Sequence, residues 1–164
     1  MTTIEPALSR STKDAMAARV AVLAQLGEYW ALLPGLSAAK PETIAFAQTY
    51  LADDFIARFG DVPFEVGGAE MLAGIAAEND ELWVTHVEPY YVMVDVEQGR
   101  AAAHFHEKLT DPVDGEIQRE SSYFTHIVFT LDEGRLKLRH EHMVEVPAKF
   151  NVDARPGISG APGK

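Results

Sequence analysis

The chain contains no cysteine among its 164 residues. This absence excludes disulfides, zinc–thiolate sites and cysteine nucleophiles together, and it fits the cytoplasm, which is the location we expect. The N-terminal stretch Met1–Pro6 has no basic region followed by an apolar one, so we expect no secretory signal. No run of residues approaches the roughly 20 apolar residues that a membrane-spanning helix needs.

Basic residues are scarce, with 14 Lys and Arg against 25 Asp and Glu, and the formal net charge is −11. Nucleic acids and anionic membranes require a clustered basic face, so neither is an expected partner. The phosphate-binding and dinucleotide-binding glycine patterns are absent, as is the Gly-x-Ser-x-Gly elbow of many hydrolases. We therefore expect a protein that works without a cofactor.

The first half of the chain has helical periodicity. Ser11–Asp14 has capping-box spacing, and Pro34-Gly35 stops the helix that follows. Three helices are predicted, at about Lys13–Leu33, from Pro41 to Asp53-Asp54, and at about Ala69–Glu78. The apolar stripe expected on the first helix comprises Met16, Val20, Leu23, Trp30 and Leu33.

From Leu82 onward the pattern has period two, which is typical of strands. Four long strands are predicted, at Leu82–Val96, Arg100–Leu109, Ile117–Leu131 and Arg135–Val146, with a short one at Phe55–Phe59. This order predicts an α+β fold in which three N-terminal helices pack on a curved antiparallel β-sheet and leave a cone with one open mouth. We expect a single domain over 1–148 and an extended tail over 149–164.

Histidines are unusually frequent on the predicted strands. On Arg100–Leu109, alternation places His104 and His106 on one face and Phe105 and Glu107 on the other, and we expect the histidines to face the cone. On the last strand, alternation places His140 and His142 on the face of Leu136 and Leu138. It sends Glu141 to the opposite face, so only a β-bulge near Arg139 would turn Glu141 into the cone.

Three interpretations of the histidines remain open. Each could be a structural or surface histidine. The set could instead perform general acid–base chemistry, because histidine titrates near neutral pH and a carboxylate can orient it. The pairs His104/His106 and His140/His142 could also hold a metal, since strand geometry separates their side chains by about 7 Å. We favour acid–base chemistry and predict no metal.

Several motifs resemble the nuclear transport factor 2-like (NTF2-like) superfamily, in its SnoaL-like or ketosteroid-isomerase-like branch, over residues 13–147. They are Tyr50–Phe55, Leu82–Val87 and the closing hairpin Phe129–Leu136. The histidines His86 and His104 are similar to a pair in scytalone dehydratases. The run His140–Met143 is similar to one in phenazine-biosynthesis A/B proteins, and this resemblance implies that Glu141 is the catalytic glutamate. It also implies a homodimer formed through the outer sheet face, to which Trp83, Val87, Tyr91 and Met93 could contribute.

The sequence therefore predicts a cofactor-independent acid–base enzyme of isomerase, dehydratase or cyclase type, acting on a small hydrophobic carbonyl-containing metabolite. The expected catalytic residues are His86, His104, His126 and Glu141. The expected substrate-binding residues are Tyr29, Trp30, His106, Tyr123, His140 and His142. The alternative is a non-catalytic module or accessory subunit that binds a small ligand.

Overall fold

The computed structural model describes residues 10–61 and 65–146, with the side chains of residues 10, 11, 85, 86 and 88 left aside. The predicted tail, 149–164, lies outside these residues. The helices are α1 (Arg10–Leu32), a 3-10 turn (Leu33–Gly35), α2 (Pro41–Gln48) and α3 (Gly68–Glu81). The strands are β1 (Leu51–Phe59), β2 (Val66–Gly67), β3 (Trp83–Asp95), β4 (Arg100–Thr110), β5 (Ile117–Asp132) and β6 (Arg135–Glu145).

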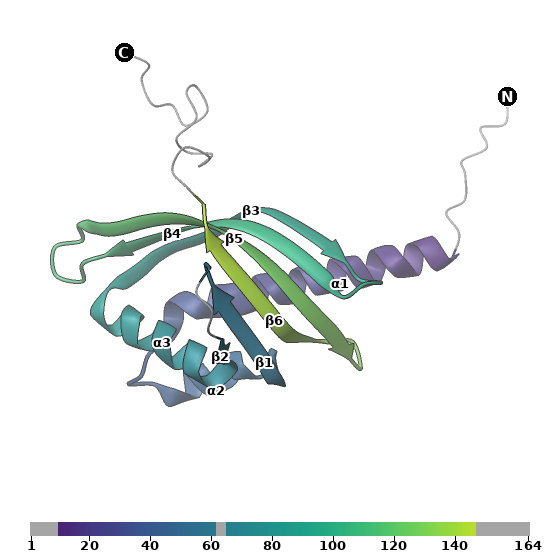
Figure 1. Ribbon diagram of the computed structural model, residues 1–164, viewed down its shortest axis with the longest axis horizontal. Coiled ribbons are helices and arrows are strands. Elements are labelled where there is room, and N and C mark those ends of the chain that lie inside the picture. The colour runs from purple at the N-terminus through teal and green to yellow at the C-terminus, as the bar shows by residue number, and fades with distance from the viewer. Residues whose placement is uncertain (1–9, 62–64, 147–164) are drawn as a thin grey trace, which may run out of the picture.

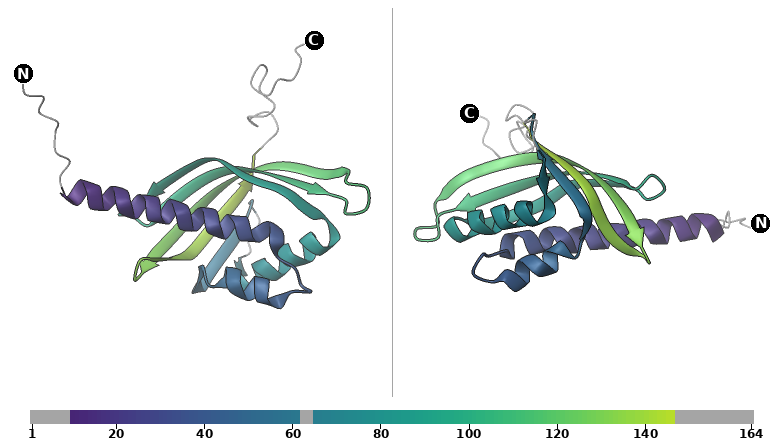
Figure 2. Two further views of the ribbon diagram at one scale, coloured as in Figure 1. Left: turned by 180° about the vertical axis from the view of Figure 1, so that it is seen from behind. Right: turned by 60° about the horizontal axis from the view of Figure 1, so that its bottom comes forward.

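The strands form one strongly curved sheet in the order β2-β1-β6-β5-β4-β3. All neighbouring strands are antiparallel except β1 and β6, which run parallel. The three helices lie on the concave side of this sheet, so the predicted α+β cone is confirmed (Figures 1 and 2). Within the described residues, no helix is both long and apolar enough to cross a membrane.

The buried stripe of α1 differs from the expected one. Val22, Leu26 and Tyr29 are almost fully buried, whereas Met16 and Val20 are 56% and 65% exposed. Residues two positions apart on a helix point to nearly opposite sides, so Val20 is turned away from the core that buries Val22. The N-terminal part of α1 also runs past the end of the sheet (Figure 2). The helical period is therefore correct, but the buried stripe is rotated about the helix axis relative to the expected one.

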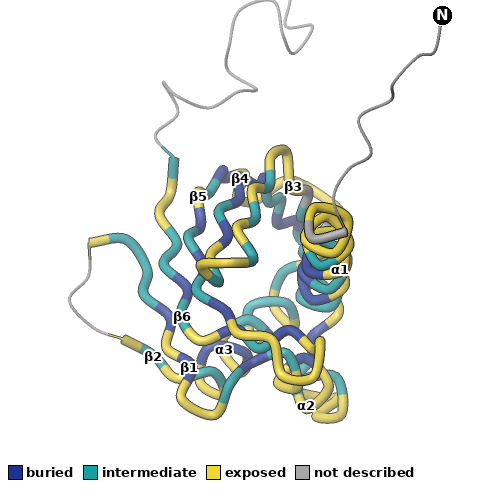
Figure 3. Tube along the Cα trace, turned by 90° about the vertical axis from the view of Figure 1, so that its right-hand side faces the viewer, coloured by how far each residue is buried: buried dark blue, intermediate teal, exposed yellow. Residues whose placement is uncertain are grey.

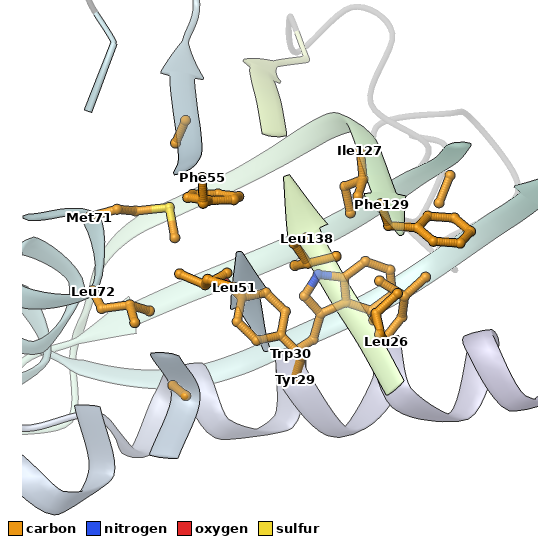
Figure 4. Packing of buried hydrophobic residues seen from close by; sticks show 14 of the residues in the cluster. Leu26, Tyr29, Trp30, Leu51, Phe55, Met71, Leu72, Ile127, Phe129 and Leu138 are labelled. Atoms are coloured by element: carbon orange, nitrogen blue, oxygen red, sulfur yellow. The ribbon is translucent and has the colours of Figure 1, made fainter. Parts of the chain in front are cut away.

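The hydrophobic core fills the space between the helices and the concave face, where buried positions concentrate (Figure 3). Leu26 and Trp30 of α1 meet Leu138 of β6 and Phe129 of β5 (Figure 4). Burying a Leu, Ile or Phe side chain contributes about 1.5–3 kcal/mol each. This packing holds α1 across the sheet and leaves a hollow toward α3.

The second helix is shorter than predicted, because β1 begins at Leu51 rather than at Phe55. The backbone explains the difference. Leu138 of β6 donates its N–H to the carbonyl of Tyr50 at 2.8 Å, which starts the parallel pairing of the two strands. Tertiary pairing with β6 thus overrides the helical preference of Leu51 and Ala52.

A β-bulge interrupts β6 at Arg139. Leu138 is paired with Phe129 of β5 and His140 with Val128, so Arg139 has no partner across the ladder. The extra residue reverses the alternation of all residues that follow it. Consequently Leu138 and Glu141 both face the concave side, although three positions separate them. The sequence predicted that only a bulge near Arg139 would turn Glu141 into the cone, and this bulge is present.

The β3–β4 turn contains Gly99 at a φ of +63°, and an added Cβ there would lie 2.4 Å from the carbonyl oxygen of Phe129. Gly134 has a φ of +81° but has no such neighbour within 4 Å. We expect both glycine-to-alanine changes to cost about 1–2 kcal/mol for the left-handed backbone. Gly99→Ala should cost about 1–3 kcal/mol more because of overpacking. Urea unfolding of the two variants measures the difference, and equal losses would contradict the close approach.

Candidate functional site

A cavity of about 220 Å³ opens between α1, α3 and the concave face of the sheet. Its walls are mainly apolar, with Trp30, Leu33, Phe59, Met71, Ile75, Val84, Val87, Phe105 and Met143. The polar groups in the lining are Tyr29, Glu78, Asn79, Glu107, Arg119, Tyr123 and Glu141. An apolar hollow with a few convergent polar groups is the usual form of a small-molecule site.

Glu141 is the most deeply buried acid of this cavity, at 4% exposure. Its Oε1 accepts a hydrogen bond from the hydroxyl of Thr125 at 2.9 Å. Burial raises the pKa of the Glu141 carboxyl, and the hydrogen bond from Thr125 opposes this shift only in part. A carboxyl with a raised pKa in an apolar hollow is suited to accept and return a proton near neutral pH.

Tyr29 lines the same cavity and is near enough to Glu141 for the charge of that carboxylate to act on its phenol. Burial raises the pKa of its phenol well above the ordinary value, and the negative charge of Glu141 raises this pKa further. The phenolic hydroxyl is buried and has no hydrogen-bond partner among the described residues. A buried donor without a partner costs about 1–3 kcal/mol, which a ligand oxygen could recover. Trp30, the next residue, has a second unpartnered donor at Nε1.

The more exposed end of the cavity contains one guanidinium and two carboxylates. Arg119 donates to Glu78 at 2.7 Å and lies 3.5 Å from Glu107. Burial raises the pKa of Glu107, the charge of Glu78 adds to the shift, and Arg119 opposes it. This end is therefore polar and acidic overall, while the end at Glu141 is apolar.

Asn79 of α3 is another polar residue of the cavity lining. Its amide nitrogen donates to the carbonyls of Leu33 and Leu36, at 2.8 and 3.0 Å, which fixes the side chain. Its buried Oδ1 has no hydrogen-bond partner. The lining thus offers an acceptor at Asn79 as well as donors at Tyr29 and Trp30.

The expected position of the histidines was wrong wherever their side chains are described. His104, His106, His126, His140 and His142 lie on the outer face of the sheet. On β4, Phe105 and Glu107 line the cavity, so the alternating His104 and His106 point away from it. On β6 the bulge at Arg139 reverses the alternation, which turns His140 and His142 outward and Glu141 inward.

The buried histidine on that outer face has a structural role. His106 donates from Nε2 to Glu120 at 2.7 Å, and its Nδ1 lies 3.0 Å from the hydroxyl of Ser122. The rings of His104 and His106 lie about 6 Å from that of Tyr90, at 5.7 and 6.1 Å. The predicted substrate-binding role of His106 is thus replaced by these contacts with neighbouring strands.

Two strand positions remain to be assigned. His126 pairs with His142 across β5 and β6 on the outer face, so it cannot act in the cavity. The backbone of His86 pairs with Lys108 in the sheet, but its side chain lies outside the described residues. The catalytic role of His86 stays a prediction. Tyr29, Trp30, Tyr123 and Glu141 do line the cavity together.

Sequence reasoning missed Glu78, Asn79, Glu107 and Arg119 as cavity residues. One signal was available for Glu107, because Ala101, Ala103, Phe105 and Leu109 have its parity and form an apolar face. No short-range pattern marked Arg119, since it meets Glu78 across 41 positions. The described residues contain no group of three or more metal-ligating side chains placed to hold an ion.

In sequence, the chain matches no protein-family model and no curated protein. Three solved structures have similar folds. An NTF2-like protein from Novosphingobium aromaticivorans is 12% identical, with 94% of this chain and 97% of that one covered and a TM-score of 0.61. ActVI-ORFA from Streptomyces coelicolor is 17% identical, with coverages of 77% and 95% and a TM-score of 0.56. A candidate isomerase from Bacillus subtilis is 14% identical, with coverages of 79% and 89% and a TM-score of 0.55.

These identities are low, so the shared property is the fold. The chain has the NTF2-like fold, which confirms the fold expected from the closing hairpin and the order of elements.

The raised pKa of Glu141 makes the stability of the protein depend on pH. A carboxyl whose pKa is higher in the folded state stabilises the fold fully below its ordinary pKa of about 4.3. That contribution is lost as the pH rises through the folded-state pKa. We expect Glu141→Gln, which cannot ionise, to become progressively more stable than the parent protein from pH 4.5 to pH 8.

Thermal unfolding at three pH values and constant ionic strength measures this difference. Glu81→Gln, at the exposed end of α3, removes the same charge and is the matched control. Parallel pH profiles for the parent protein and Glu141→Gln would show that the carboxyl is not buried in an apolar site.

Proposed function

We propose that the protein is a cofactor-independent acid–base enzyme that acts on a small, largely apolar carbonyl compound bound in the cavity. The observation that carries the proposal is the buried carboxyl of Glu141 beside the unpartnered hydroxyl of Tyr29. The similarity of the fold to a candidate isomerase is consistent with this chemistry. Because folds host many functions, the argument rests on these two groups rather than on the fold.

In the proposed reaction, the carboxylate of Glu141 removes a proton from the carbon beside the substrate carbonyl. The electron pair moves onto the carbonyl oxygen and forms an enolate. The hydroxyl of Tyr29 donates a hydrogen bond to this oxygen, and its raised pKa keeps it protonated for that role. Glu141 then returns the proton to another carbon, which is an isomerisation. Alternatively, the enolate breaks the C–O bond of a β-hydroxyl group, which takes the proton from Glu141 and leaves as water, which is a dehydration.

The environment of Glu141 suits it to this exchange. The hydrogen bond from Thr125 fixes the carboxylate, and the apolar lining makes the carboxylate a stronger base than it is in water. Thr125 lies beside Ile127 and Phe129 on the inward positions of β5, so a rigid strand supports it. Such a supporting contact keeps a reacting group in a productive orientation.

The alternative is a module that binds a ligand in the same cavity without chemistry. The apolar walls and the unpartnered Oδ1 of Asn79 would serve binding equally well. The two proposals differ in one observable step, the removal of a proton from a bound carbonyl compound.

Exchange of α-hydrogens for deuterium measures that step directly. We expect the protein to accelerate this exchange for a small apolar ketone such as 2-tetralone in deuterium oxide, followed by NMR. Glu141→Gln should lower the accelerated rate about 10²- to 10⁴-fold, because the base is lost. Tyr29→Phe should lower it less and should not destabilise the fold, because the lost hydroxyl has no partner.

Glu81→Gln is the control for charge and should exchange at the parent rate. Ketone binding without accelerated exchange in the parent protein would replace the enzyme proposal with the binding module. An unchanged rate in Glu141→Gln would remove Glu141 from the chemistry.

We also propose that two copies of the chain associate through the outer face of the sheet. One cross-strand row of residues supports this. It runs from Tyr91 of β3 through His104 of β4 and Phe124 of β5 to Val144 of β6. Tyr91, Phe124 and Val144 are its apolar members. Their exposed fractions are 57%, 46% and 39%. Val87, expected on this surface, lines the cavity instead.

Phe124→Asp should convert such a dimer to a monomer, because it places a charge at the centre of an apolar contact. Sedimentation velocity measures the change. Val113→Asp, at a loop position that is 93% exposed, is the control and should leave the dimer intact. A parent protein that sediments as a monomer at all concentrations would refute the proposal.

A further inference from the structure

A second pocket, of about 240 Å³, lies where the start of β4 and the end of β3 meet α1. We call it the turn pocket because two of its lining residues, Asp95 and Arg100, flank the β3–β4 turn. Arg19 of α1, Arg100 of β4 and His126 of β5 line it, together with Met93, Asp95 and Ala102. It shares no lining residue with the cavity of Glu141, so it is a separate site.

The turn pocket brings cationic groups together in an acidic protein. Arg19 and Arg100 come from elements 81 positions apart, and both side chains line the same hollow. Neither guanidinium has a hydrogen bond or ion pair to any side chain in the described part of the chain. Arg119 and Arg139, by contrast, are each paired with a carboxylate. In a chain with a net charge of −11, the lining of this pocket has two arginines and one acidic residue, Asp95.

The imidazole of His126 is sensitive to the charges around this pocket. Its pKa is lowered first by burial and then by Arg100, His140 and His142, which all surround it on the outer face. A bound anion would oppose the effect of these positive neighbours, because a negative charge next to an imidazole favours the protonated form. His126 can therefore serve as a third donor that becomes charged when an anion binds.

The single carboxylate in the lining is already engaged. Asp95 accepts the backbone N–H of Gln98 at 3.0 Å, which caps the β3–β4 turn. Ala102 pairs with both Met93 and His126 across the sheet, and its small side chain leaves the floor of the pocket open. The lining thus contains two guanidiniums and one carboxylate, and its formal charge is positive.

We propose that the turn pocket binds a small oxyanion, a phosphate or carboxylate group, which is held by Arg19 and Arg100 and by the imidazole of His126. Guanidinium groups match the planar oxygens of phosphate and carboxylate with paired hydrogen bonds. The site lies outside the cavity, so the anion takes no part in the proton transfer at Glu141. The anion is either a second ligand or a charged group of a partner molecule. The role of His126 is therefore binding at this pocket.

The test follows the imidazole of His126 by NMR in the full chain, at constant ionic strength, while inorganic phosphate replaces chloride. Saturable binding and an upward shift of the His126 pKa are expected. Arg100→Gln and Arg19→Gln should each weaken phosphate binding about tenfold, since a hydrogen bond to a charged group contributes about 1.5–3 kcal/mol. A parallel titration with acetate separates carboxylate from phosphate preference.

Arg135→Gln is the matched control, because it removes an exposed arginine of β6 that does not line the turn pocket. It should bind phosphate within about twofold of the parent protein, whereas a general attraction to positive charge would affect all three variants equally. Equal weakening in the three variants, or a His126 pKa that does not respond to either anion, would overturn the proposal. Circular dichroism of each variant confirms that the sheet is intact, and His126→Gln, which retains both arginines, should still lose part of the affinity.

Discussion

The burial of one carboxyl group, that of Glu141, constrains much of this structure. A carboxylate removed from water is costly unless it is hydrogen-bonded or accepts a proton. Thr125 provides one hydrogen bond, and the raised pKa shows that the remaining cost is not fully offset. The apolar packing of α1 on the sheet stabilises the fold sufficiently to tolerate this group. In the proposed reaction, this remaining cost is what makes the carboxylate reactive toward a bound carbonyl compound.

The fold was largely predictable, because it depends on periodicity that extends over many residues. The long strands and helices were located to within a few positions, since their patterns repeat several times. The errors arose where a long-range contact decides the local structure. Leu51 begins a strand because β6 lies beside it, and Met16 is exposed because the core covers the side of α1 that carries Val22 and Leu26.

The candidate site was less predictable for a specific physical reason. Alternation indicates which residues share a face but not which face is the inner one, and that ambiguity placed His104 and His106 in the cavity. On β4, the apolar residues that share the parity of Glu107 indicate which face is the inner one. On β6, a single unpaired residue, Arg139, reverses which of the following residues face inward. The family resemblance favoured Glu141 because it compares whole motifs, in which such a bulge is already included. The resulting sheet has a mainly apolar inner face that includes Glu107 and Glu141, and a histidine-rich outer face.

The bulge also has an evolutionary consequence. Deleting Arg139 alone would restore uninterrupted alternation, so the residues that follow would exchange their faces without any change in their identity. His140 and His142 would then point toward the hollow, and Glu141 would point to solvent. A single-codon deletion or insertion at this point of β6 therefore separates an acid-lined pocket from an imidazole-lined one. Related chains could have diverged in chemistry by gaining or losing one residue, rather than by accumulating substitutions in the pocket.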